Sequence, residues 1–393
     1  MKPDIAQRSW TLAVIVALGA VALVSPSHAQ IAVSANDNKV VNDNGTVKVV
    51  PNAPPDTIAI IDLKASPPRV VTEVQAPVSV SGPPLSVALT PDEGLALVTA
   101  SNKVDPADPT KQTPDNRVSV IDLKASPPKV IATLEAGKGA AGISINRQGT
   151  LALVSNMVDG TVSVFTIQGK TVTPAGTVEV GGPKAGGGMV AIAPDGRTAL
   201  VSRRDDNRVS VLSIDGTKVE YTKRDLTAGV RPTPLDIAVN GAFAIVGSLA
   251  GAASGDHDSI SLIDLTAKPP RVVDTIGVLG PTAEGFKISP DSSVVAVVVH
   301  NGSNRAKDSP FYNDAGKLVI VRVMGRTLSR VAEAPIGHWS QGAAFSPDGK
   351  TILVGNMVEK DYWVFQWDGS TLRDTGQRVK MNGGPVAIRT ADK

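Results

Sequence analysis

The chain contains one ten-residue stretch in three versions: IDLKASPPRV at residues 61–70, IDLKASPPKV at 121–130 and IDLTAKPPRV at 263–272. A second phrase recurs between them, in which a Pro-Asp turn precedes an apolar strand, at residues 90–92, 193–196, 289–291 and 346–349. Repeats of about 40 to 60 residues that each hold about four short strands are typical of β-propeller blades. The repeats therefore predict a propeller.

The two ends of the repeat region are incomplete in complementary ways. Seven Gly- or Pro-rich openings lead to inner strands, at residues 82–84, 137–139, 182–184, 230–232, 280–282, 337–339 and 382–385. The last opening leads to one strand only, at 386–389, and the region before Gly82 has strand signals at 46–50, 57–63 and 69–74 but no inner strand. We predict an all-β, seven-bladed β-propeller that begins near Asn38 and is closed by pairing of the N-terminal and C-terminal strands. One or more β-sandwiches are the alternative fold, which would not explain the complementary ends.

The first 29 residues are typical of a secretory signal peptide. Lys2 and Arg8 give a basic start, residues 11–24 are apolar, and Ser27-His28-Ala29 is a small-x-small cleavage signal. We predict cleavage after Ala29, a periplasmic or secreted protein, and a propeller domain over residues 30–393. A retained N-terminal anchor is the alternative. No later stretch approaches the length of a membrane-spanning helix, so no span is expected after signal removal.

The composition narrows the possible partners. The formal net charge is +2, both signs are interspersed, and aromatic residues make up 3% of the chain. A nucleic-acid partner is therefore not expected, because neither a basic patch nor aromatic stacking platforms are visible. The chain has no Cys, so the fold is held without disulfides.

Four tetrapeptides carry a family resemblance: LVTA at 97–100, LVSN at 153–156, LVSR at 200–203 and LVGN at 353–356. Each of the first three is followed by a Val-Ser-Val strand. In these features the chain resembles the YVTN family of β-propellers, and the resemblance covers nearly all of the chain after the signal peptide. The Tyr that opens the family's namesake tetrapeptide is Leu in all four copies. The resemblance implies the fold, which hosts many unrelated activities.

Loop lengths point to one face of the predicted propeller. Turns from first to second and from third to fourth strands lie on one face and are tight. The opposite face, here named the long-loop face, carries the blade openings and three long loops at 101–116, 248–258 and 300–315. Long loops on a rigid scaffold often carry function. We therefore expect the site on the long-loop face.

Several polar residues on this face are candidates for chemistry. We expect catalysis, if it occurs, from Glu284, His300 and His338, and ligand binding from Arg203, Arg204 and Arg231. A carboxylate, imidazoles and guanidinium groups around one channel can do acid–base work on a lactone or hold an anion. These residue types are similar to those of lactonase-like propellers such as phosphogluconolactonase and carboxymuconate cyclase, but no motif matches residue by residue and no role is carried over. The alternative is a polar rim around a solvated channel.

A metal site is not expected. Asp256, His257 and Asp258 have ligating side chains, but adjacent residues rarely converge on one ion, and the small residues before them favour a mobile surface loop. No cofactor motif is present, which leaves the cofactor unknown.

Three classes of function remain. The leading hypothesis is a binding or interaction protein that takes a small molecule or a protein partner at the long-loop face. The second is a lactonase-like hydrolase or isomerase. The third is a scaffold subunit of a periplasmic dehydrogenase, since the heavy subunit of methylamine dehydrogenase is similar in repeat type. Whether the protein is an enzyme is left open by the sequence.

Overall fold

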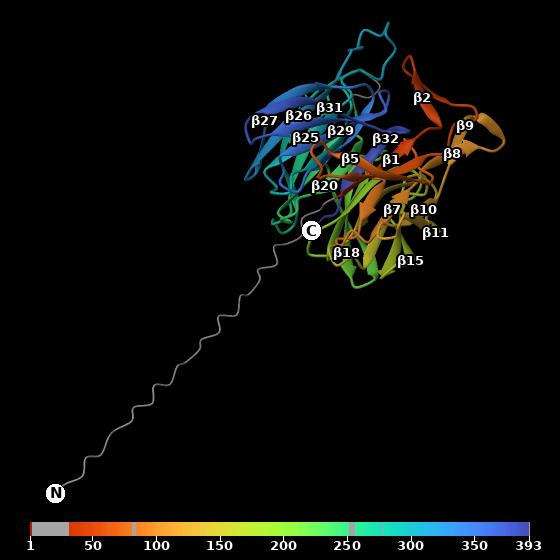
Figure 1. Ribbon diagram of the computed structural model, residues 1–393. Coiled ribbons are helices and arrows are strands. Elements are labelled where there is room, and N and C mark those ends of the chain that lie inside the picture. The colour runs from red at the N-terminus through yellow and green to blue at the C-terminus, as the bar shows by residue number, and fades with distance from the viewer. Residues whose placement is uncertain (2–30, 81–83, 251–255, 278, 393) are drawn as a thin grey trace.

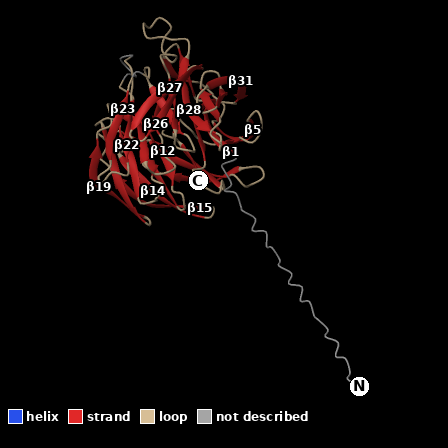
Figure 2. Cartoon of the chain, turned by 90° about the vertical axis from the view of Figure 1, so that its left-hand side faces the viewer, coloured by secondary structure: helices blue, strands red, loops and turns tan. Residues whose placement is uncertain are grey.

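The structure is a computed structural model that describes residues 1, 31–80, 84–250, 256–277 and 279–392. Within these residues the elements are strands, loops and turns (Figure 2). The described part of the chain contains no helix that is long and apolar enough to cross a membrane. The predicted signal peptide lies outside the described residues except for Met1, so its cleavage and the export of the protein stay predictions.

The described strands form seven four-stranded sheets, which we number as blades in chain order (Figure 1). From innermost to outermost, blade 1 holds β32 (Gly384–Thr390), β1 (Ile31–Asp37), β4 (Thr57–Asp62) and β5 (Arg69–Gln75), and blade 2 holds β6 (Val87–Leu89), β7 (Leu95–Thr99), β10 (Arg117–Asp122) and β11 (Lys129–Glu135). Blade 3 holds β12 (Ala140–Ile145), β13 (Leu151–Asn156), β14 (Thr161–Gln168) and β15 (Thr171–Glu179), and blade 4 holds β16 (Gly187–Ile192), β17 (Thr198–Arg203), β18 (Arg208–Asp215) and β19 (Lys218–Leu226).

The remaining three blades follow the same order. Blade 5 holds β20 (Pro232–Ile237), β21 (Phe243–Ser248), β22 (Ile260–Asp264) and β23 (Arg271–Ile276), and blade 6 holds β24 (Ala283–Ile288), β25 (Val294–Val299), β26 (Gly316–Met324) and β27 (Thr327–Ile336). Blade 7 holds β28 (Ser340–Phe345), β29 (Thr351–Asn356), β30 (Asp361–Trp367) and β31 (Leu372–Lys380). Each innermost strand lies beside that of the next blade, and β28 lies beside β32, which closes the ring.

The predicted closure is confirmed, but the predicted starting point is wrong. β32 pairs antiparallel with β1, which is the second strand of blade 1 and begins at Ile31 rather than near Asn38. Residues 46–50, predicted as a blade strand, instead contribute β3 (Thr46–Val49) to a separate hairpin with β2 (Val40–Asp43). Its turn is Asn44-Gly45, with φ of 46° and 85°, and this dipeptide favours a two-residue hairpin turn because both positions need positive φ.

The thrice-repeated stretch forms the turn between third and fourth strands. In blades 1, 2 and 5, the Oδ1 atom of Asp62, Asp122 or Asp264 accepts hydrogen bonds from the backbone N–H groups two and three residues later, over 2.9–3.4 Å. An Asp side chain that bonds the following backbone in this way stabilises a turn. The sequence recurs because this local turn recurs.

The Pro-Asp phrase forms the turn between first and second strands. The Oδ1 atoms of Asp92, Asp195, Asp291 and Asp348 each accept from the N–H group two residues later, over 2.9–3.1 Å. Both kinds of tight turn therefore have their own internal hydrogen bonds, as expected for the face opposite the long loops.

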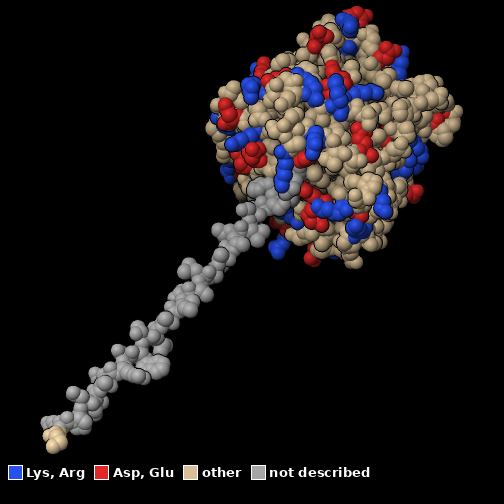
Figure 3. All heavy atoms as spheres, viewed as in Figure 1, with Lys and Arg blue, Asp and Glu red and all other residues tan. Residues whose placement is uncertain are grey.

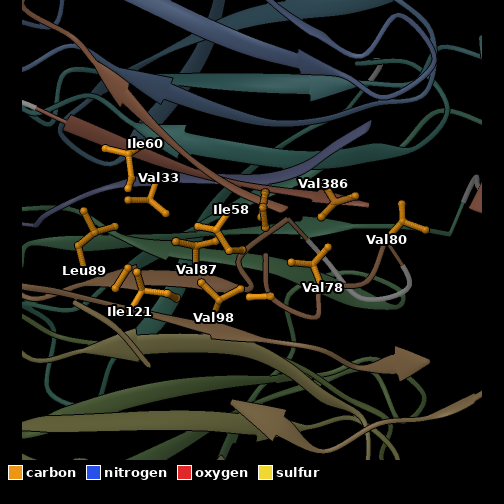
Figure 4. Packing of buried hydrophobic residues seen from close by; sticks show 14 of the residues in the cluster. Val33, Ile58, Ile60, Val78, Val80, Val87, Leu89, Val98, Ile121 and Val386 are labelled. Carbon is orange, nitrogen blue, oxygen red and sulfur yellow. The ribbon is translucent and has the colours of Figure 1, made fainter. Parts of the chain in front are cut away.

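Apolar side chains fill the spaces between neighbouring blades. Figure 4 shows one such cluster between blades 1 and 2, where Val33, Ile58 and Val386 from blade 1 lie near Val87 and Val98 from blade 2. All five are essentially buried, and burying an aliphatic side chain of this size stabilises the fold by about 1.5–3 kcal/mol. Packing between blades therefore holds the ring rigid around its axis.

Two hairpins and the loop at 300–315 project from the long-loop face. The β2–β3 hairpin lies beside the hairpin of β8 (Asn102–Asp105) and β9 (Asp108–Pro114), and both project together in Figure 1. The β2–β3 hairpin is also tied to the loop at 300–315, because Asn42 Nδ2 donates to the Asn304 carbonyl over 2.7 Å and Lys307 N donates to Asn44 Oδ1 over 2.9 Å. The hairpin therefore spans part of this face.

Pro84 and Leu85, which precede β6, lie at the centre of the ring. Pro84 lies against blade 6, where a Cβ atom added to Gly285 would come within 2.5 Å of Pro84 Cγ. Leu85 belongs to a buried cluster with Met189 of blade 4 and Leu235 of blade 5. Since these blades stand across the axis from blade 2, Pro84 and Leu85 obstruct the central channel.

Candidate functional site

The long-loop end of the channel contains Glu284, the second residue of β24. The pairing of β24 with β25 shifts register between Ala283 and Gly285, so Glu284 is the extra residue of a β-bulge. Bulges redirect a side chain relative to the regular pleat and are common beside functional sites. The side chain is only partly exposed, whereas the β24 residues around it are buried.

Three charged groups from three blades interact at this position. The pKa of Glu284 is raised from 4.5 to about 7, chiefly by burial and also by the Asp258 carboxylate, while the Arg204 guanidinium acts to lower it. A carboxyl group with this pKa is only partly ionised at neutral pH, and such groups occur often at working sites. We name Glu284, Asp258 and Arg204 the channel cluster.

Local contacts position the other two members of the channel cluster. Asp258 is buried, and its Oδ2 accepts from the Thr282 N–H over 2.8 Å. Arg204 Nε lies 3.0 Å from Asp205 Oδ1, while its Nη1 lies 3.8 Å from Met157 Sδ of blade 3. The positive charge of Arg204 is therefore partly neutralised before any ligand binds.

His300 and Gln341 form a buried polar pair beside the channel. His300 directly follows β25, is 3% exposed, and its Nε2 lies 3.5 Å from Gln341 Nε2. Burial lowers the pKa of His300 to about 4, so the ring is neutral at pH 7. His300 Nδ1 and Gln341 Oε1 are buried without hydrogen-bond partners.

His338 lies at the surface of the same face, where its ring contacts two carboxylates. Its Nδ1 is 2.6 Å from Glu359 Oε1 and its Nε2 is 3.4 Å from Asp314 Oδ1. Burial acts to lower the pKa of His338, but the two carboxylates outweigh it and the pKa is raised. The histidine is therefore engaged in fixing the loops of blades 6 and 7.

The three predicted arginines occupy different environments. The Arg203 guanidinium turns toward the outer strands of blade 4, with Nη1 3.1 Å from Tyr221 Oη and 3.3 Å from Asp225 Oδ2 and with Nη2 paired to Asp206. Arg231 is exposed, and its backbone N–H donates to Asn207 Oδ1 over 2.7 Å.

Of the predicted site residues, the structure thus brings together Glu284 and Arg204, with His300 buried nearby in blade 6. It leaves His338 and Arg231 apart from the channel cluster, and Arg203 inside blade 4.

Two residues near the channel had no predicted role. Gln341 occupies the same second position on β28 that Glu284 occupies on β24, and a comparison of the blade openings would have found it. Asp258 was seen only with Asp256 and His257, which are exposed whereas Asp258 is buried. Among the described residues no group of three or more His, Asp and Glu side chains is arranged to hold a metal ion.

A second charged cluster lies toward the opposite end of the channel. Lys287 Nζ is 3.2 Å from Asp236 Oδ2 and 3.0 Å from Asp392 Oδ1, and all but Asp392 are nearly buried. Arg389 lines the same small cavity as these two carboxylates. On the face that Figure 3 shows, positive and negative side chains are interspersed.

Comparison with known proteins supports the fold only. No protein-family model matches the sequence, and neither does any curated protein. Among solved structures, a candidate 6-phosphogluconolactonase from Bacteroides fragilis is 16% identical over 92% of this chain and 98% of its own, with a TM-score of 0.69. The periplasmic gluconolactonase of Pseudomonas aeruginosa is 17% identical over 92% and 99%, with a TM-score of 0.64. Hydrazine synthase of Kuenenia stuttgartiensis is 18% identical over 79% and 90%, with a TM-score of 0.59.

The chain is therefore a seven-bladed β-propeller with lactonase-like structural neighbours. The resemblance to the YVTN family stays a prediction, because no family model matches. Neighbours with unrelated chemistry share the fold, so function has to be argued from the site.

Proposed function

We propose that this protein binds a small, hydroxyl-bearing molecule that is uncharged or cationic, at the long-loop end of its channel. The observation that carries the proposal is the channel cluster, in which Glu284, Asp258 and Arg204 from three blades interact at one opening. Binding sites for small molecules are concave and place a few polar groups on a rigid scaffold. A propeller channel narrowed by Pro84 and Leu85 supplies that scaffold.

The charge of the cluster defines the class of ligand. Glu284 and Asp258 provide carboxylate oxygens, and Asp205 already pairs with the single guanidinium, that of Arg204. Hydroxyl groups donate hydrogen bonds to carboxylates, whereas a phosphate would meet like charge. A neutral sugar, polyol or lactone suits this site better than a phosphosugar.

Opening of a neutral lactone is the second candidate function, and Glu284 is the reason for it. A general base works best when its pKa lies near the working pH, and the pKa of Glu284 is about 7. In this mechanism the Glu284 carboxylate takes a proton from water as the water oxygen bonds to the lactone carbonyl carbon, and Arg204 stabilises the developing oxyanion. The ring C–O bond then breaks, and the protonated Glu284 gives its proton to the departing ring oxygen, which becomes a hydroxyl group.

Calorimetric titration with D-glucono-1,5-lactone, D-gluconate and 6-phosphogluconate tests the proposal, with parallel pH-stat measurement of ring opening. We expect the neutral lactone to bind most tightly and Glu284→Gln to weaken it by about tenfold, the loss of one hydrogen bond to a charged group. Glu333→Gln is the matched control, because Glu333 lies on the outermost strand β27 and pairs with Arg330 at the surface. Binding without turnover supports a binding protein, and turnover that Glu284→Gln abolishes supports the hydrolase. Preferential binding of 6-phosphogluconate would overturn the assignment of ligand class.

We also propose a periplasmic or secreted location, which the predicted signal peptide supports. The mass of the protein purified from its source should place the mature N-terminus at Gln30. A retained Met1 would contradict it.

A further inference from the structure

Blades 3 and 7 carry similar loops beside similar openings, and one of the positions at which they differ is informative. Blade 3 has Asn156-Met157-Val158 after its second strand and blade 7 has Asn356-Met357-Val358. In each, the Asn Oδ1 accepts from a glycine N–H over 3.0 Å, that of residue 137 in blade 3 and that of residue 337 in blade 7. Two residues beyond each of these glycines, blade 3 has Gly139 and blade 7 has Trp339.

Trp339 adopts a backbone conformation that suits glycine. Its φ is 51°, and that of Gly139 at the equivalent position is 72°. Glycine adopts positive φ freely, whereas a bulky residue there is strained, and strain of this kind is concentrated at functional sites. Two contacts hold Trp339 in this conformation: its backbone N–H donates to Ser303 Oγ, and its side chain is buried. Arg231 and Thr282, directly before β20 and β24, also have positive φ, so this position accepts a side chain, and in blade 7 that side chain is an indole.

The indole forms one wall of a cavity of about 170 Å³ between the β2–β3 hairpin and blade 7. Its apolar lining comes from Val40, Val41, Trp339, Met357 and Val358, and its polar lining from Asp37, Asn38, Asn42 and Lys360. A cavity of about 150 Å³ with apolar walls is large enough for a benzene ring. We name this cavity the Trp339 pocket.

Asn38 is one of the residues that line the Trp339 pocket, and one of its side-chain atoms is buried without a partner. Asn38 lines the pocket, is 6% exposed, and donates from Nδ2 to the Pro55 carbonyl over 2.9 Å. That bond fixes the orientation of the amide, because a carbonyl oxygen only accepts. Asn38 Oδ1 is therefore an acceptor, and it is buried without a hydrogen-bond partner. A buried acceptor left unpaired costs free energy that a donor on a ligand would recover.

We propose that the Trp339 pocket binds a small aromatic compound that carries an O–H or N–H donor. The ring packs against Trp339, Met357 and the valines, and the donor bonds Asn38 Oδ1. The pocket shares no lining residue with the channel cluster, so this site goes beyond the function proposed above. Phenol is the simplest probe, and anisole is its matched analogue without a donor.

Calorimetric titration of the full chain tests the proposal. We expect saturable phenol binding and about tenfold weaker anisole binding, the difference that one hydrogen bond makes. Val358→Phe should abolish phenol binding by filling the pocket. Val158→Phe, at the equivalent position of blade 3, should leave it unchanged. Both valines are exposed at the surface, which keeps the core intact in both variants.

Tryptophan fluorescence gives an independent readout of the location. Phenol should change the emission of the parent and of Trp363→Phe, in which the lost ring stacks on Arg378 at the surface of blade 7. Trp339→Phe should lose the change. Equal affinity for phenol and anisole, equal effects of the two valine variants, or a pocket occupied by water alone with no saturable heat would each overturn the proposal.

Discussion

The Tyr362 hydroxyl lies 2.8 Å from Ser34 Oγ and joins two residues that are 328 positions apart. Tyr362 stands on β30 of blade 7 and Ser34 on β1 of blade 1, so the bond crosses the junction where the ring closes. Burial raises the pKa of Tyr362, and the phenol is neutral. Ser34 also donates to Asn36 Oδ1 over 2.6 Å. A short chain of polar groups therefore supports the closing blade from within.

Tyr362→Phe should lower the free energy of unfolding by about 1–2 kcal/mol, because it leaves a buried hydroxyl partner without its bond. Urea denaturation measures the change. Tyr312→Phe is the control, since the Tyr312 hydroxyl bonds Asp314 at the surface and its loss should leave stability almost unchanged. Equal effects in the two variants would show that the Ser34–Tyr362 bond contributes nothing to closure.

Glu284 should make the protein less stable as pH rises. Its folded pKa of about 7 lies above the ordinary value of 4.5, so between these values the folded state holds more protons than the unfolded state. Glu284→Gln should therefore gain stability relative to the parent as pH is raised from 4.5 to 8, by about 2 kcal/mol. Thermal melts at several pH values test this. A constant difference across the range would mean that Glu284 titrates normally.

His300 should act in the opposite direction. Its folded pKa of about 4 lies below the ordinary value of 6.5, so the unfolded state binds more protons between these values and the folded state loses stability as pH falls. The parent should lose about 3 kcal/mol relative to His300→Gln on going from pH 7 to pH 4. Parallel pH profiles for the variant and the parent would contradict a buried neutral imidazole.

Lys287 should be needed for folding stability because it neutralises two carboxylates in the channel. Lys287→Met leaves Asp236 buried without its cation and should cost about 3 kcal/mol. Lys218→Met removes an exposed pair with Glu220 and should leave stability almost unchanged. Chemical denaturation of both variants checks the difference, and a mild effect of Lys287→Met would show that water screens the channel.

The parts of the fold that were predictable are those held by local bonds. Asp62 and Asp92 bond backbone groups two residues away, so their turns can be recognised from a few letters. β1 was missed because it contains buried polar residues, and those need partners that are remote in sequence. Ser34 bonds Tyr362, and Asn36 donates to Thr57 Oγ1 over 3.2 Å. When only the sequence is read, a run of polar residues whose partners are remote in the chain is typical of a loop.

The candidate site was also predictable only in part from the sequence. The position of Glu284 in a blade opening placed it on the long-loop face, because openings follow from the repeat. Which charges face it was not predictable. Arg203 and Arg204 are adjacent in sequence, yet one turns into blade 4 and the other interacts with Glu284. Side-chain direction at the end of a strand depends on tertiary contacts such as the one between Arg204 and Met157.

Pro84 and Leu85 obstruct the centre of the ring, so the channel is expected to be accessible from the long-loop face only. We expect a molecule that enters from the long-loop face to leave by the same mouth, since Leu85 packs with residues of blades 4 and 5 across the axis. An incoming ligand and a departing one then use the same opening. If a reaction occurs there, its product obstructs the next substrate, and inhibition by product should be competitive.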